Sequence, residues 1–131
     1  MSQIRAITIN DVQYNVAQAS AVEQKKIMLH IGAKIAFNSA ATNAQQIDSN
    51  MVFGLLMTLP ESMFDEIAGV VLRKAYKAGS DTPVTLADFQ GGMTGYFKLV
   101  AEAIMFNLSD YFTWLDSDNA ARRAQAKGVK A

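Results

Sequence analysis

Residues 93–115 read MTGYFKLVAEAIMFNLSDYFTWL, a long, aromatic-rich amphipathic run. Its apolar side chains recur at steps of three and four residues, which is the period of a helix with one buried face. The run therefore predicts one continuous helix about 35 Å long, and Gly91, Gly92 and Gly95 predict a bend at its start. The apolar positions are Met93, Phe97, Val100, Ile104, Leu108, Phe112 and Leu115.

Four aromatic residues crowd the second half of this run: Phe106, Tyr111, Phe112 and Trp114. At about 100° per residue they cannot all occupy one face of a helix, and Phe106 and Phe112 point far apart. We assign Phe112 to the core. Because aromatic side chains are frequent anchors of protein interfaces, we assign Phe106, Tyr111 and Trp114 to a partner-binding surface; a purely internal role for the cluster is the open alternative.

A basic segment, residues 118–131, follows the run. It carries Arg122, Arg123, Lys127 and Lys130 against Asp118, a net charge of +3, so the rest of this neutral chain carries −3. The segment lacks apolar anchors, and we expect a flexible tail after a helical domain that spans residues 1–117. Such a tail is commonly no more than a solvated terminus. The functional alternative is an arm for a partner with an acidic surface, which makes Arg122 and Arg123 candidate binding residues.

The region before the run predicts a β-hairpin and helices. Apolar residues alternate with polar ones on both sides of Asn10-Asp11, the pattern of two strands joined by a tight turn. Ser20 and Glu23 form a capping-box pattern that opens a helix over residues 21–37, with Val22, Met28, Ile31 and Ile35 on its apolar face. Residues 38–49 predict a loop or a frayed helix end.

Two further helices are expected before the long run. One covers residues 51–58, and the next starts at Pro60 and continues through Ala75, with Gly79 as its C-cap. Thr85 is a candidate N-cap at the start of another helix. The expected fold class is α+β and mostly α: an N-terminal β-hairpin followed by about four helices in a single domain.

Composition narrows the functional classes. Of the 131 residues, 50% are hydrophobic and 18% are charged, which is below the usual ~25%. This shortfall of charge indicates that part of the apolar surface is covered by a partner or by self-association.

The absence of cysteine excludes disulfides and thiolate metal sites. Neutral net charge argues against a nucleic-acid-binding domain. Without a signal peptide or a run of about 20 apolar residues, we expect a cytoplasmic protein with no membrane contact.

No catalytic constellation stands out in the chain. His30 is the only histidine, so it has no second ligand at zinc-site spacing and is expected to be structural or exposed. Asp65 and Glu66 are adjacent and face different directions on a helix, which makes them a poor acid–base pair. The glycines at 91, 92 and 95 lack the Gly-Lys-Ser/Thr ending of a phosphate loop. We expect neither enzymatic activity nor a metal or cofactor.

Three segments carry a resemblance to a known family: ITIN…VQY in residues 7–14, VTLADF in residues 84–89, and FNLSDYF in residues 106–112. Together they resemble the tail assembly chaperones of long-tailed bacteriophages and prophages. The resemblance implies a non-enzymatic oligomer in the bacterial host cytoplasm. It would coat the tape measure protein and keep it soluble until tail tube subunits polymerise around it. Such chaperones are commonly made in a short form and a longer, frameshifted form.

Two other functional classes remain open. One is a phage assembly adaptor for head-tail joining or tail completion, which would form a closed ring or stay monomeric and would have no affinity for the tape measure protein. The other is a small nucleic-acid-binding regulator that uses the basic tail. Binding by such a regulator would weaken steeply with salt.

Overall fold

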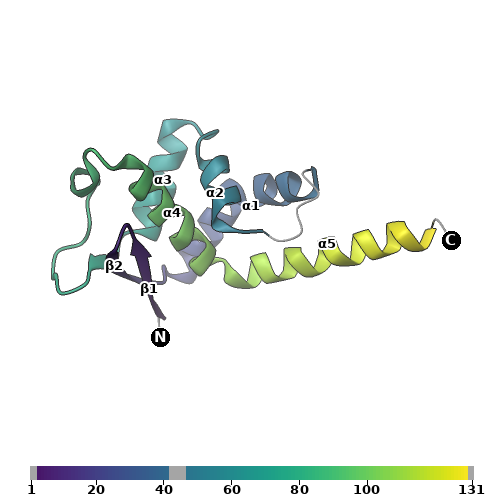
Figure 1. Ribbon diagram of the computed structural model, residues 1–131, viewed down its shortest axis with the longest axis horizontal. Coiled ribbons are helices and arrows are strands. Elements are labelled where there is room, and N and C mark those ends of the chain that lie inside the picture. The colour runs from purple at the N-terminus through teal and green to yellow at the C-terminus, as the bar shows by residue number, and fades with distance from the viewer. Residues whose placement is uncertain (1–2, 42–46, 130–131) are drawn as a thin grey trace.

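The computed structural model describes residues 3–41 and 47–129, and the fold is mostly helical with a small antiparallel sheet (Figure 1). Three strands, one short 3-10 helix and, within these residues, five α-helices follow one another along the chain. They are β1 (Ile4–Ile9), β2 (Val12–Ala17), α1 (Ala21–Ala41), α2 (Ser49–Leu56), α3 (Glu61–Val71), β3 (Ala75–Lys77), η1 (Leu86–Phe89), α4 (Met93–Asn107) and α5 (Ser109–Val129).

The predicted hairpin is confirmed. β1 and β2 pair in antiparallel register from Ile4 opposite Ala17 to Ile9 opposite Val12. The turn residues Asn10 and Asp11 have positive φ angles of 50° and 67°, a conformation that Asn and Asp tolerate better than other non-glycine residues. Alternate residues of the hairpin, including Ile7 and Ile9, are buried against the helices.

A third strand replaces the end of a predicted helix. α3 ends at Val71, and Ala75 pairs with Val16 of β2 instead of continuing the helix. Gly79 is consequently no helix cap; it has a φ of +85° and lies in the turn after β3. Pairing with β2 gives the backbone of residues 75–77 hydrogen-bond partners. The pairing is a tertiary effect that helical periodicity in residues 61–75 does not reveal.

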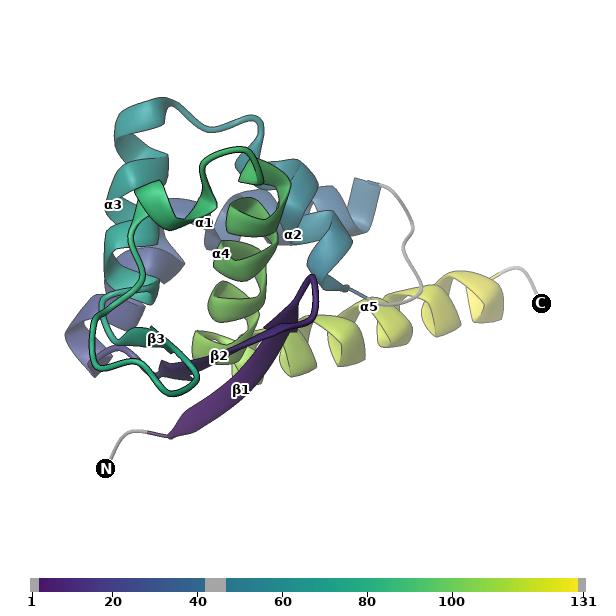
Figure 2. The same cartoon turned by 60° about the vertical axis from the view of Figure 1, so that its left-hand side comes forward.

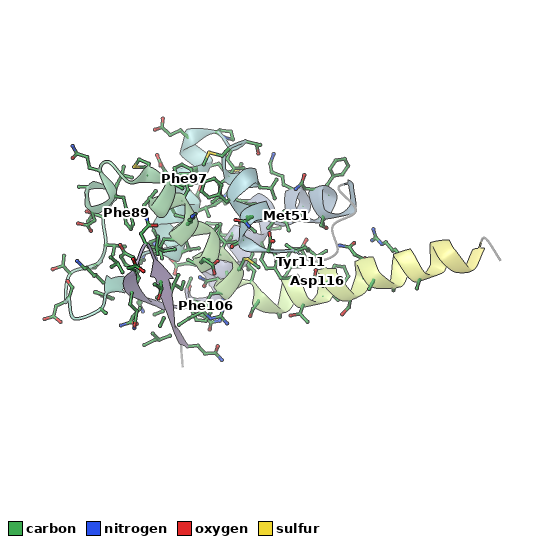
Figure 3. The ribbon with its side chains drawn as sticks, viewed as in Figure 1. Met51, Phe89, Phe97, Phe106, Tyr111 and Asp116 are labelled. Atoms are coloured by element: carbon green, nitrogen blue, oxygen red, sulfur yellow. The ribbon has the colours of Figure 1, made fainter. Side chains whose placement is uncertain are left out.

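α4 forms the centre of the hydrophobic core. Its residues Leu99, Val100 and Ile104 are fully buried, and the helix packs against β1, α2 and α3 (Figure 2). Figure 3 labels Phe97 near the start of α4. Its ring stacks on Phe64 of α3 at 4.6 Å and meets Phe53 of α2 edge-on at 6.2 Å. The sheet and the helices therefore share one core.

The long run of residues 93–115 is two helices, so the prediction of one continuous helix was wrong. The break is at Leu108, where φ is −115° and ψ is 30°. The expected bend at the glycines is also present, since α4 begins only at Met93 and Gly91 has a φ of +83°. The break changes the direction of the chain between Phe106 and Phe112, and both rings are buried, at 3% and 5% exposure.

The apolar face of α1 differs from the predicted one. Ile31 and Ile35 are fully buried as expected, together with Ile27, but Val22 is 69% and Met28 37% exposed. Ser20 and Glu23 do form the predicted cap: the Glu23 amide donates to Ser20 Oγ at 3.3 Å. Residues 38–49 were predicted to be a loop or a frayed helix end; the helix continues through the first part of this segment to Ala41, and residues 42–46 lie outside the described residues.

The basic segment is helical where a tail without structure was expected. α5 continues without interruption from Ser109 to Val129. Both views show its second half leaving the rest of the molecule as a long arm (Figures 1 and 2). Beyond Asn119, every side chain that the structure describes on α5 is exposed.

Candidate partner-binding surface

Phe106 belongs to the core and not to a partner-binding surface, so this assignment was wrong. The side chain is 3% exposed. The guanidinium carbon of Arg5, on β1, lies 4.9 Å from the centre of the Phe106 ring in a cation–π contact. The physical reason is the break at Leu108: Phe106 lies before it and contacts Arg5 of β1, whereas Phe112 lies after it, so that both rings are buried.

Tyr111 and Trp114 form a surface pair near the start of α5. The Tyr111 hydroxyl donates a hydrogen bond to the Gly32 carbonyl of α1 at 2.7 Å. The indole of Trp114 stacks on the Tyr111 ring at 6.2 Å, with an interplanar angle of 15°. Trp114 is 57% exposed, as predicted for a member of the surface, whereas Tyr111 is half-buried and acts as its support. Burial raises the pKa of the Tyr111 phenol above its ordinary value of 10.0.

The first half of α5 is fixed to the body by two further side chains. Asp116 accepts a hydrogen bond from the Ile47 amide at 3.1 Å. The buried Asn119 amide donates to Ser39 Oγ of α1 at 3.1 Å. These contacts, together with the Tyr111 hydrogen bond, hold Trp114 in place at the surface.

Arg122 and Arg123 lie beyond these contacts, on the projecting half of α5. Arg122 is exposed and forms an ion pair with Asp118 at 2.8 Å, one helical turn before it. That pair partly offsets the charge that Arg122 offers to a partner. The backbone of Arg123 is helical, and its side chain lies outside the described part of the structure.

An exposed apolar stripe on α1 was missed by the sequence analysis. It consists of Val22, Leu29 and Phe37, which are 69%, 78% and 78% exposed. These residues are seven and eight positions apart, about two helical turns each, and therefore lie on one face. The sequence does contain a signal that could have revealed this stripe. The isoleucines at 27, 31 and 35 mark the buried face of the helix, so residues 22, 29 and 37 lie on a different, exposed face.

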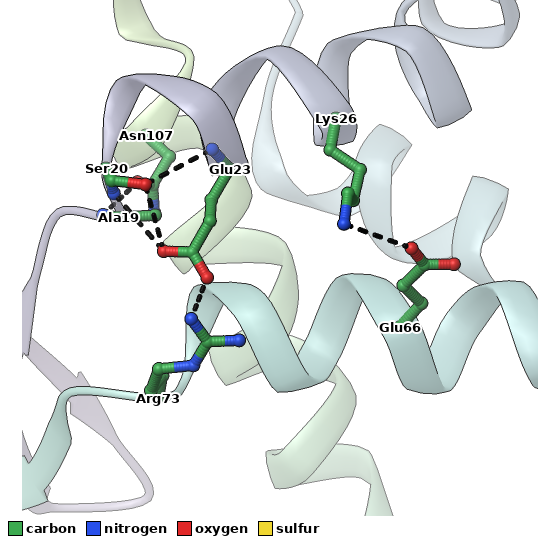
Figure 4. Close-up of polar contacts among 7 residues, drawn as sticks. All are labelled: Ala19, Ser20, Glu23, Lys26, Glu66, Arg73 and Asn107. Carbon is green, nitrogen blue, oxygen red and sulfur yellow. Dashed lines mark hydrogen bonds and ion pairs between the residues drawn. The ribbon is translucent and has the colours of Figure 1, made fainter.

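The charged side chains around α1 join elements of the fold (Figure 4). Arg73 forms an ion pair with Glu23, and Lys26 approaches Glu66 at 3.8 Å. His30 Nε2 lies 3.4 Å from the other Glu66 oxygen. Within residues 3–41 and 47–129, no three His, Cys, Asp or Glu side chains cluster in a way that could hold a metal ion.

None of the helices in the described part of the chain combines the length and apolar character of a membrane span. The main chemical feature of the candidate surface is the set of exposed aromatic and aliphatic side chains on α1 and α5.

Comparisons of this chain with known protein families, with curated proteins and with solved structures found no match.

Proposed function

We propose that this protein is a tail assembly chaperone of the long-tailed phage type, which acts in the bacterial cytoplasm and holds the tape measure protein soluble until tail tube subunits assemble around it. The observation that carries the proposal is the Tyr111–Trp114 pair. An indole that is 57% exposed yet stacked on a hydrogen-bonded tyrosine is a rigid apolar anchor. Such anchors are typical of protein interfaces.

A long helical client suits this kind of surface. Helix-in-groove recognition places apolar residues at three- and four-residue steps against aromatic and aliphatic side chains. The α1 stripe of Val22, Leu29 and Phe37 offers further apolar contacts. A client several hundred residues long presents many such segments, so many copies of a weak binder hold it through multivalency. Self-association of the chaperone increases the effective concentration of binding surfaces in the same way.

The direct test is co-expression with the tape measure protein of the same genome. We expect that protein to be soluble with this chain and insoluble without it, and the two to co-purify. Trp114→Ala should release the client while the chain stays folded. Ser117→Ala, an exposed position one turn further along α5, is the matched control and should retain it.

Two results would reject the assignment. The first is a tape measure protein that is equally insoluble with and without this chain. The second is a purified chain that forms a closed ring, or remains monomeric, and has no affinity for tape measure segments, which identifies an assembly adaptor. If the complex forms and persists with Trp114→Ala, the chaperone function holds and the binding surface is elsewhere.

A further inference from the structure

An apolar groove lies on a different part of the molecule, between the end of α2 and the starts of α3 and α4. It has a volume of about 360 Å³. Phe64, Tyr96 and Phe97 contribute aromatic rings to it, with Phe64 and Tyr96 in edge contact at 6.0 Å. None of the groove residues belongs to α1 or α5, so the groove is separate from the Tyr111–Trp114 pair.

The sides of this groove expose large flexible side chains to solvent. Met57, Leu86 and Met93 line it and are 54%, 56% and 41% exposed. Three such side chains around one depression are unusual in a surface that serves only solvation. Methionine is unbranched and polarisable, and it adapts to different apolar partners. The groove therefore has the lining of a site that accepts apolar side chains from another molecule.

The charge at the groove indicates what kind of partner it takes. Glu61 and Asp65 line it and are four residues apart on α3, so their carboxylates lie on one face of that helix. Both are exposed, and neither has an ion-pair partner among the described residues. None of the described residues that line the groove is basic. A partner with positive charge beside its apolar residues is complementary to this arrangement.

We propose that this groove binds an amphipathic helix that carries lysine or arginine next to its apolar face. The apolar residues of the helix insert between Met57, Leu86 and Met93 and reach the aromatic rings, while its cations pair with Glu61 and Asp65. Helix-in-groove binding of this kind uses anchors at i, i+3 or i+4, and i+7. The proposal does not depend on the chaperone function, because it uses different residues and specifies the charge of the ligand.

A pair of synthetic peptides tests the proposal on the full chain. One is a fluorescently labelled amphipathic helix of leucine and lysine, about five turns long; the other has glutamate in place of every lysine. We expect the anisotropy of the lysine peptide to report saturable binding that weakens with salt, and the glutamate peptide to bind at least about tenfold more weakly. A leucine–lysine peptide of scrambled order, which lacks the apolar face, should not bind.

Substitutions locate the binding. Leu86→Ala with Met93→Ala should weaken binding of the lysine peptide about tenfold or more, whereas Leu29→Ala, which removes an exposed apolar side chain on α1, should not. Glu61→Gln with Asp65→Asn should remove the salt dependence. The control for lost charge is Asp81→Asn with Asp110→Asn, which removes two exposed carboxylates elsewhere and should leave binding unchanged. Circular dichroism verifies that each variant is folded.

Several outcomes would overturn the proposal. One is equal binding of the ordered and scrambled peptides, and another is equal loss in the Leu29 variant and the groove variant. If the groove variant instead dissociates an oligomer of this chain and binds the peptide as well as the parent does, the occupant is a second copy. None of these results decides the chaperone assignment, whose test is solubility of the tape measure protein.

Discussion

Asn107 shows how much of this fold depends on one buried polar side chain. Its carbonyl oxygen accepts a hydrogen bond from the Ala19 amide at 2.7 Å, just before α1 begins. Its amide group donates to the Ala103 carbonyl at 2.9 Å, within α4. With 4% exposure, Asn107 joins the end of α4 to the start of α1 at the point where the chain turns into α5.

Replacing Asn107 by alanine should lower the free energy of unfolding by about 1–3 kcal/mol. The change leaves the Ala19 N–H without its side-chain acceptor, and the cost of an unsatisfied, partly buried donor has this magnitude. Urea unfolding at neutral pH measures the difference. Asn50→Ala, at an exposed position of α2, serves as the control. Equal stability of the two variants would show that the Asn107 hydrogen bonds contribute little.

Alanine substitution should destabilise the fold much more at Phe106 than at Trp114. Phe106→Ala removes a buried ring and should cost about 3–5 kcal/mol of stability. Trp114→Ala removes a largely exposed one and should cost about 1 kcal/mol or less. Thermal or urea unfolding of both variants gives the comparison. A larger stability loss for Trp114 than for Phe106 would contradict the assignment of core and surface.

Tyr111 should make stability fall at alkaline pH. Burial raises the pKa of the Tyr111 phenol in the folded state above 10.0. The stabilisation of the fold by the protonated phenol is therefore complete at any pH below the pKa of the unfolded state. This stabilisation is lost as pH rises through the folded-state pKa, because the ionised oxygen no longer donates to the Gly32 carbonyl. Urea unfolding between about pH 8 and pH 11 should show a shallower decline for Tyr111→Phe. Some decline remains, because burial also raises the pKa values of Tyr14 and Tyr96. An unchanged slope would contradict the prediction.

At the scale of elements, the break between α4 and α5 determines what the sequence could predict. The apolar period in residues 93–115 identifies the helical conformation and the core position of Phe112. It cannot reveal the break, because the residues on both sides have helical hydrogen bonds and the side-chain contact beside the break joins Asn107 to Ala19, which is distant in the sequence. Trp114 is therefore exposed as expected and Phe106 is buried, while a role of Trp114 in partner binding stays a prediction.

The strand β3 shows the same limit for a short element. Three residues are too few for a periodic signal, and the apolar steps of α3 run into them without interruption. Local signals performed better: the turn residues Asn10 and Asp11, the Ser20 cap and the Thr85 cap all occur where their side-chain chemistry predicts them. The hairpin and the helix caps were predictable because their signals lie between neighbouring elements or within one turn, whereas the pairing of β3 with the distant β2 was not.

The projecting half of α5 should be dispensable for folding. The last described contact between α5 and the body is the Asn119–Ser39 hydrogen bond. A chain ending at Ala121 should therefore unfold within about 1 kcal/mol of the full chain, whereas a chain ending at Leu108 should lose far more because Phe112 and Leu115 are missing from the core. A severe loss in the first variant would show that the arm packs on the body.

For the whole molecule, exposed apolar side chains on α1, on α5 and around the groove predict self-association. They are the α1 stripe, the Tyr111–Trp114 pair and the groove. Sedimentation velocity over a wide concentration range should show a shift from monomer to larger species. Phe37→Ala with Trp114→Ala should weaken association more than it lowers stability. A strict monomer at high protein concentration would remove this basis for multivalent binding.

The two edge strands of the sheet differ in length. β3 is three residues long, and beyond it Tyr76 forms a bridge to Pro83, which has no N–H to donate. β1, at the other edge of the sheet, extends over six residues. β1 therefore offers an incoming strand the longer edge. Pairing through β1 alone joins two copies edge to edge, because each copy contributes its one long edge to the pair.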